Sequence, residues 1–142
     1  MSIKVSTQLH VTKKELWQAL TEVDKMKQWF FNHIPQFKPE IGFTTSFPVV
    51  SDGSTFTHLW KVKEVVPEEK LVLEWCYEEY TGCAEVVFKL EKLSKQQTRL
   101  QVENIGLSTF PQNIPEFSEQ CCIAGWEYFM KERLPDYLSK KT

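Results

Sequence analysis

The chain has 142 residues, of which 42% are hydrophobic and 25% charged, and its formal net charge is −2. This composition is typical of one soluble globular domain spanning residues 1–142, and it excludes disordered, collagen-like and coiled-coil chains. The sequence contains no apolar run of about 18 residues that could span a membrane and no basic cluster that could bind nucleic acid. We therefore expect a cytoplasmic protein with neither kind of partner.

The N-terminal part of the chain is predicted to form one strand and two short helices. Residues 3–9 alternate between polar and apolar side chains, which predicts a strand. Thr12 and Glu15 match a capping box, so a helix should begin near residue 13. Asp24 is placed to cap a second helix over residues 24–31.

The rest of the chain is predicted to form an antiparallel meander followed by one long helix. The predicted strands are residues 41–47, 55–66, 71–77, 83–93 and 97–106. After a loop at residues 107–113, helical spacing of apolar residues returns over residues 114–138. Pro115 suits the first turn of this helix, whereas Pro135 should kink or end it. Because strands and helices do not alternate as βαβ units, the fold class is α+β.

The four cysteines do not form a metal-binding or redox motif. Cys76, Cys83, Cys121 and Cys122 lack paired CxxC spacing, and the chain carries no export signal. In a reducing compartment such residues are small buried hydrophobic side chains. One pairing stays open, because Cys76 and Cys83 could face each other across a hairpin.

Aromatic residues are unusually frequent, with five Trp, ten Phe and four Tyr. Three polar residues, His58, Tyr77 and Asn104, share the strand face of apolar neighbours and should therefore point inward. A buried polar group without a partner costs roughly 1–3 kcal/mol, so these groups must bond to each other, to water or to a ligand. A small-molecule cavity with apolar walls and a filled, self-satisfied core are the two alternatives.

Three segments of the sequence resemble the START-like ligand-binding superfamily, and they occur in the expected order. Residues 9–30 (LHVTKKELWQALTEVDKMKQWF) resemble its opening strand and helix. Residues 64–77 (EVVPEEKLVLEWCY) and 125–138 (GWEYFMKERLPDYL) resemble the branch named after the activator of heat-shock protein 90 ATPase.

The resemblance implies a helix-grip fold, in which a curved antiparallel sheet of about six strands wraps around the C-terminal helix. Proteins of this superfamily hold lipids, sterols, polyketides or other apolar molecules in a cavity between the helix and the sheet. The resemblance implies no cofactor, no metal and no general catalytic motif. The ligand-binding residues that it implies are His58, Trp60, Trp75, Tyr77, Phe88, Asn104, Trp126, Phe129 and Met130.

We therefore expect this protein to bind a small hydrophobic molecule, lipid-like or aromatic, rather than to catalyse a reaction. For a cyclase-type enzyme, His58 is the best general base, but no partner motif accompanies it. A chaperone-associated interaction module is the other alternative, with residues 29–31, Phe110 and Pro111 either exposed to a partner or capping the cavity mouth. A homodimer formed through a sheet edge also stays open.

Overall fold

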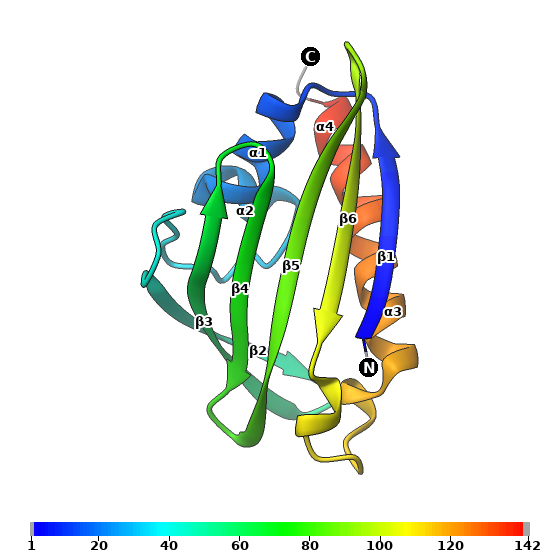
Figure 1. Ribbon diagram of the computed structural model, residues 1–142. Coiled ribbons are helices and arrows are strands. Elements are labelled where there is room, and N and C mark those ends of the chain that lie inside the picture. The colour runs from blue at the N-terminus through cyan, green and yellow to red at the C-terminus, as the bar shows by residue number, and fades with distance from the viewer. Residues whose placement is uncertain (1, 141–142) are drawn as a thin grey trace.

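The computed structural model describes residues 2–140 and contains a six-stranded antiparallel sheet with helices on one face (Figure 1). The strands are β1 (Ser2–Leu9), β2 (Thr44–Ser51), β3 (Ser54–Val66), β4 (Lys70–Tyr77), β5 (Tyr80–Ser94) and β6 (Gln97–Ile105). Their order across the sheet is β1-β6-β5-β4-β3-β2, so each strand from β2 to β5 pairs with the next one in sequence and β6 also pairs with β1. The predicted α+β class and antiparallel meander are confirmed.

Two short helices, α1 (Lys13–Thr21) and α2 (Val23–Trp29), follow the first strand. The predicted capping box is present, because the Thr12 hydroxyl accepts from the Glu15 amide at 3.1 Å and the Glu15 carboxylate accepts from the Thr12 amide at 3.2 Å. The predicted cap of the second helix is wrong. Glu22 ends α1 and directly precedes α2, so Asp24 lies in the first turn rather than at the cap.

Strand β2 lies further along the chain than the prediction of residues 41–47. Asp52 and Gly53 both have positive φ angles, 51° and 82°, and form a two-residue hairpin turn between Ser51 and Ser54. Such a tight turn requires both strands to continue up to it. Pro48 does not interrupt the strand, because β2 is an edge strand and proline is tolerated there.

The C-terminal helix begins later than predicted and continues past Pro135. Two short turns, η1 (Leu107–Thr109) and η2 (Pro115–Phe117), precede it, so Pro115 starts a separate turn. The Ser118 hydroxyl caps α3 (Glu119–Tyr128) by accepting from the Cys121 amide at 3.2 Å.

A wide π turn, η3 (Phe129–Arg133), then leads into α4 (Leu134–Ser139). Proline lacks the amide hydrogen of a regular helix and crowds the preceding carbonyl, and the widened turn accommodates it. None of the helices within residues 2–140 is long and apolar enough to cross a membrane.

The core lies between the inner face of the sheet and the helices. Along β3, Phe56, His58, Trp60 and Val62 are all buried, and the residues between them face outward. The C-terminal helix packs along β1, and its side chains Trp126, Met130, Leu134 and Leu138 are buried. The predicted inward direction of His58 is therefore confirmed.

The cysteines are not the buried hydrophobic residues that the sequence predicted. Cys76 and Cys83 are directly opposite on β4 and β5, with Cα atoms 4.5 Å apart, and they form a disulfide. Both side chains point to the outer face of the sheet, where a hairpin brings neighbouring strands close enough for this bond. Cys121 is exposed and Cys122 is half-buried.

Candidate ligand-binding site

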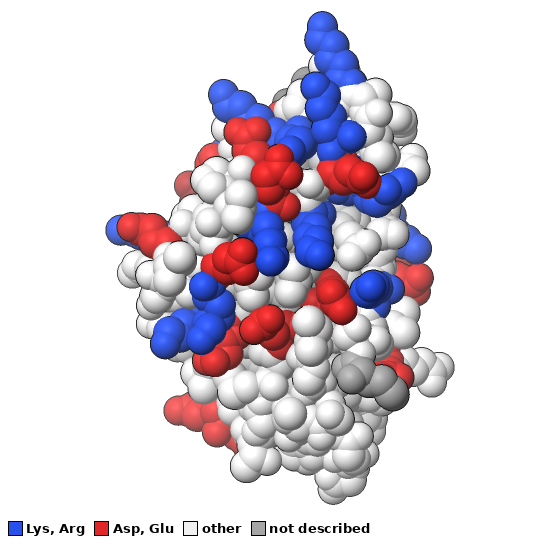
Figure 2. Space-filling view, in the orientation of Figure 1, with Lys and Arg blue, Asp and Glu red and all other residues white. Residues whose placement is uncertain are grey.

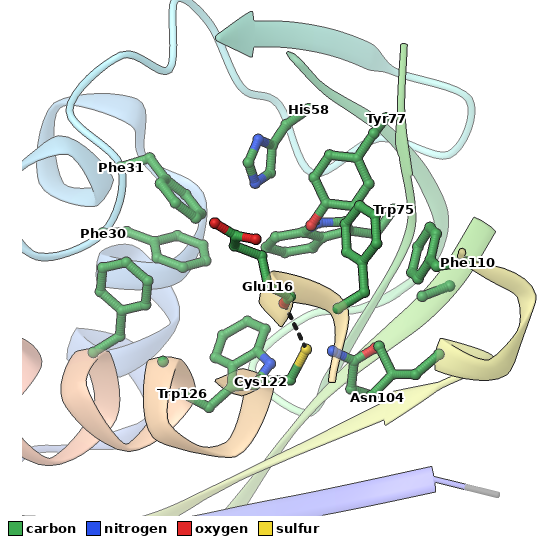
Figure 3. Close-up of a pocket in the computed structure, with 15 residues that line it drawn as sticks. Phe30, Phe31, His58, Trp75, Tyr77, Asn104, Phe110, Glu116, Cys122 and Trp126 are labelled. Atoms are coloured by element: carbon green, nitrogen blue, oxygen red, sulfur yellow. Dashed lines mark hydrogen bonds between the residues drawn. The ribbon is translucent and has the colours of Figure 1, made fainter. Parts of the chain in front are cut away.

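A cavity of about 180 Å³ lies between the inner face of the sheet, helix α3 and the segments that follow α2 and β6 (Figure 3). Its walls are mainly aromatic, with a few polar groups. The lining residues are Phe30, Phe31, His58, Trp75, Tyr77, Ala84, Asn104, Leu107, Phe110, Glu116, Phe117, Cys122, Gly125, Trp126 and Phe129.

Strand pairing places two of the polar residues together and the third apart. His58 on β3 is directly opposite Tyr77 on β4, and their ring centroids are 4.8 Å apart. Asn104 lies on β6, with strand β5 between it and β4. Ala84, on β5 opposite Trp75, adds a short side chain to the cavity floor.

His58 and Tyr77 are both neutral at physiological pH. Burial lowers the pKa of His58 to about 4, and its Nδ1 lies 3.0 Å from the carbonyl oxygen of Phe56. Since a carbonyl only accepts, Nδ1 carries the hydrogen and Nε2 is left as an acceptor. Burial raises the pKa of Tyr77, whose hydroxyl accepts from Trp75 Nε1 at 2.8 Å and keeps its own hydrogen to donate.

Asn104 supplies the cavity lining with a buried polar atom that lacks a partner. Its side chain is only 7% exposed, and within the part of the chain that the structure describes Oδ1 has no hydrogen-bond partner. Figure 3 shows its amide at the cavity wall, near Cys122. An unpaired buried oxygen costs roughly 1–3 kcal/mol unless a bound molecule donates to it.

Helix α3 contributes an open stretch of wall at Gly125. A β-carbon added there would meet no atom within 4 Å, so no neighbour requires a glycine at this position. A glycine inside a helix is destabilising by about 0.5–1 kcal/mol relative to alanine. The space beside it belongs to the cavity, which Trp126 of α3 and Phe129 of η3 also border.

The rim of the cavity carries a carboxylate and a thiol. Glu116 is half-buried, and Ser51 Oγ donates to its carboxylate at 3.2 Å. Burial raises the pKa of Cys122 to about 11, so it stays a thiol, and it donates to the carbonyl of Glu116 at 3.7 Å. Among the lining residues, all within the described range 2–140, there is no Lys or Arg.

The structure places six of the nine sequence-predicted site residues at the cavity wall: His58, Trp75, Tyr77, Asn104, Trp126 and Phe129. The other three, Trp60, Phe88 and Met130, lie in the packed core. Trp60 faces inward, but Phe30 stacks over it with ring centroids 5.6 Å apart. Phe88 packs edge-on against Trp126, and Met130 is fully buried.

Several lining residues come from segments that the strand pattern could not place. Phe30 and Phe31 follow α2, and Phe110 follows η1. Of the two alternatives for these residues, exposure to a partner or capping of the cavity, their position fits capping, since Phe30 and Phe110 are each only 4% exposed. The one sequence signal for Gly125 is a glycine inside a helical pattern. Within residues 2–140, no three His, Cys, Asp or Glu side chains come together as a metal site requires.

A curved antiparallel sheet that holds a C-terminal helix across one face, with a cavity between them, defines the START-like helix-grip class. The family model described as "Activator of Hsp90 ATPase homolog 1-like protein" matches residues 10–139. The chain therefore belongs to this family. No curated protein sequence gives a significant match.

Solved structures with this fold come from several organisms, and at these identities they show the fold alone. Protein MLL2253 from Mesorhizobium loti has a TM-score of 0.74 at 21% identity, over 100% of this chain and 99% of that one. PFC0360w, an HSP90 activator from Plasmodium falciparum, has a TM-score of 0.75 at 16% identity, over 98% and 96%. The Aha1 dimer from Colwellia psychrerythraea has a TM-score of 0.68 at 17% identity, over 95% and 98%.

Proposed function

We propose that this protein binds a small apolar molecule in the cavity between α3 and the sheet. The observation that carries the proposal is the open space at Gly125, in a core that is otherwise filled by contacting aromatic rings. A fold under selection for stability alone would gain by filling that space with a larger side chain.

The surface around the cavity suits the entry of an apolar ligand. Figure 2 shows that charged side chains cover the upper part of the visible face, whereas the lower end, where η1 lies in Figure 1, carries few of them. Residues 104–115, which supply Asn104, Leu107 and Phe110 to the lining, contain no Lys, Arg, Asp or Glu. An apolar molecule approaching this end displaces few strongly hydrated groups.

The size of the cavity limits the ligand. Pockets for drug-sized molecules enclose about 300–1,000 Å³, and an engineered cavity of about 150 Å³ binds benzene. A cavity of about 180 Å³ therefore suits a compact molecule and is too small for a sterol or a long-chain lipid in this conformation.

Blocking the cavity tests the proposal. Titration of the protein with p-xylene, followed by the indole NMR signals of Trp75 and Trp126, should give saturable shifts. Gly125→Leu places a side chain into the open space and should abolish them. The control Gln120→Leu adds the same side chain to an exposed position of α3 and should bind as the unmodified protein does. The absence of saturable shifts in the unmodified protein would exclude ligand binding here.

A second candidate function is association with an Hsp90-type chaperone. The family and the description of the Plasmodium relative as an HSP90 activator favour it. If this function holds, the domain alone should stimulate the ATPase of Hsp90. An ATPase rate that stays unchanged when the domain is added would exclude this function. The dimeric Colwellia relative raises self-association as well, which sedimentation of the purified chain tests.

A further inference from the structure

The chemistry of the cavity wall narrows the class of ligand beyond an apolar molecule, and this step rests on the proposed function. Three properties of the wall bear on it: the aromatic faces, the absence of positive charge and the unsatisfied amide of Asn104.

The aromatic faces favour a flat ligand over a flexible chain. Trp75 and Trp126 meet edge to face with centroids 5.7 Å apart, and Phe30 lies 5.7 Å from Trp126. The free surfaces of such rings are flat and rigid, and rings prefer offset-stacked or edge-on contact with other rings. A second advantage is entropic, because a rigid ligand loses less conformational freedom on binding than an alkyl chain does.

The charges of the lining disfavour an anionic ligand. No Lys or Arg borders the cavity within the described residues, and His58 is held neutral beside the Phe56 carbonyl. Glu116 adds a negative charge at the rim, where it would repel a carboxylate. Fatty acids and aromatic acids therefore fit this site poorly.

The amide of Asn104 requires a partner that the protein does not provide. Rotation of the amide by half a turn exchanges Oδ1 and Nδ2 without moving the rest of the side chain, so Oδ1 can face the cavity. A ligand hydroxyl can donate to that oxygen, whereas a methyl group of similar size cannot. Without that rotation Nδ2 is the amide atom available to the cavity, and it donates to the oxygen of the same hydroxyl.

We propose that the ligand is a neutral aromatic molecule of one or two rings bearing a hydroxyl group, and that the side-chain amide of Asn104 forms a hydrogen bond with that hydroxyl. The aromatic ring occupies the space beside Gly125, against the sides of the lining rings that face the cavity. This class is narrower than the lipid-like or aromatic ligand that the sequence suggested.

A matched pair of probes tests the role of the hydroxyl. p-Cresol and p-xylene differ by one hydroxyl in place of a methyl group, and calorimetric titration should show p-cresol binding about tenfold more tightly. Asn104→Leu should remove that difference while p-xylene still binds. If p-cresol and p-xylene bind the unmodified protein equally well, the inference fails and the proposed function stands. If neither binds, both fail.

Further probes test the charge and the shape of the ligand. 4-Methylbenzoate and 4-methylbenzylamine carry opposite charges on the same ring, and 1-octanol carries a hydroxyl on a flexible chain. Each should bind more weakly than p-cresol, and tighter binding of any of them overturns the corresponding part of the inference. If Asn104→Leu does not fold, the side-chain amide signal of Asn104 in the unmodified protein decides, since p-cresol should shift it more than p-xylene does.

Discussion

Trp75 and Tyr77, two residues apart on the same face of β4, hold each other in place at the cavity wall, because the Trp75 indole N–H donates to the Tyr77 hydroxyl at 2.8 Å. The Trp75 side chain is only 7% exposed, so little water is available to replace that acceptor. The bond fixes the orientation of an indole that forms part of the cavity surface.

Loss of this acceptor should destabilise the protein. In Tyr77→Phe the Trp75 indole N–H stays buried without a partner, which should lower the free energy of unfolding by about 1–3 kcal/mol. Urea denaturation measures the change. Tyr128→Phe is the control, since Tyr128 is 45% exposed and its change should stay within about 0.5 kcal/mol. Equal effects of the two variants would mean that the bond contributes nothing.

Acidification should destabilise the fold through His58. Its pKa is about 4 in the folded protein and 6.5 when unperturbed, so between these values the unfolded chain binds more protons and stability falls as the pH is lowered. From pH 7 to pH 4.5 this residue should account for about 2–3 kcal/mol of lost stability. The His58→Gln variant should therefore lose less stability than the unmodified protein between these two pH values, as measured by urea denaturation at each. Identical pH dependence in both proteins would contradict the prediction.

Alanine at position 125 should stabilise the chain. An added β-carbon meets no atom within 4 Å, and alanine is better than glycine inside a helix by up to about 1 kcal/mol. Gly125→Ala should therefore raise the thermal midpoint measured by circular dichroism. A lower midpoint would mean that the space at Gly125 is not open.

The disulfide should stabilise the β4–β5 hairpin against unfolding. The two cysteines are seven residues apart, and a loop of that length corresponds to about 2 kcal/mol of chain entropy. The double variant Cys76→Ser, Cys83→Ser should have a free energy of unfolding that is lower by that amount. A reductant should lower the free energy of unfolding of the unmodified protein equally. Cys121→Ser, at an exposed free cysteine, is the control. If a reductant destabilises the double variant as much as it destabilises the unmodified protein, the stabilisation does not come from this disulfide.

Local sequence signals predicted the elements whose causes are local. The capping box at Thr12 and Glu15 needs only residues three apart, and the alternation along β3 needs only one strand with one buried face. Both were therefore readable without knowledge of the fold. The end of β2 was not, because whether Pro48 breaks a strand depends on that strand lying at the sheet edge.

The candidate site was predictable on its sheet side and only partly on the other sides. The inward direction of His58 and Asn104 follows from strand parity, which predicted both correctly. Phe30 lies beyond the end of α2, and its position over Trp60 depends on the tertiary packing of two distant segments. The same packing removes Trp60 from the cavity wall, which parity alone cannot show.

The π turn at residues 129–133 has a consequence for the helix that bounds the cavity. Its buried residues Trp126, Met130, Leu134 and Leu138 recur every four positions, and in a regular α-helix such a row drifts by about 40° at each step. A turn with more residues per revolution winds less per residue and cancels part of that drift. The helix can therefore keep one continuous buried face, from the cavity at Gly125 to Leu138, without bending away.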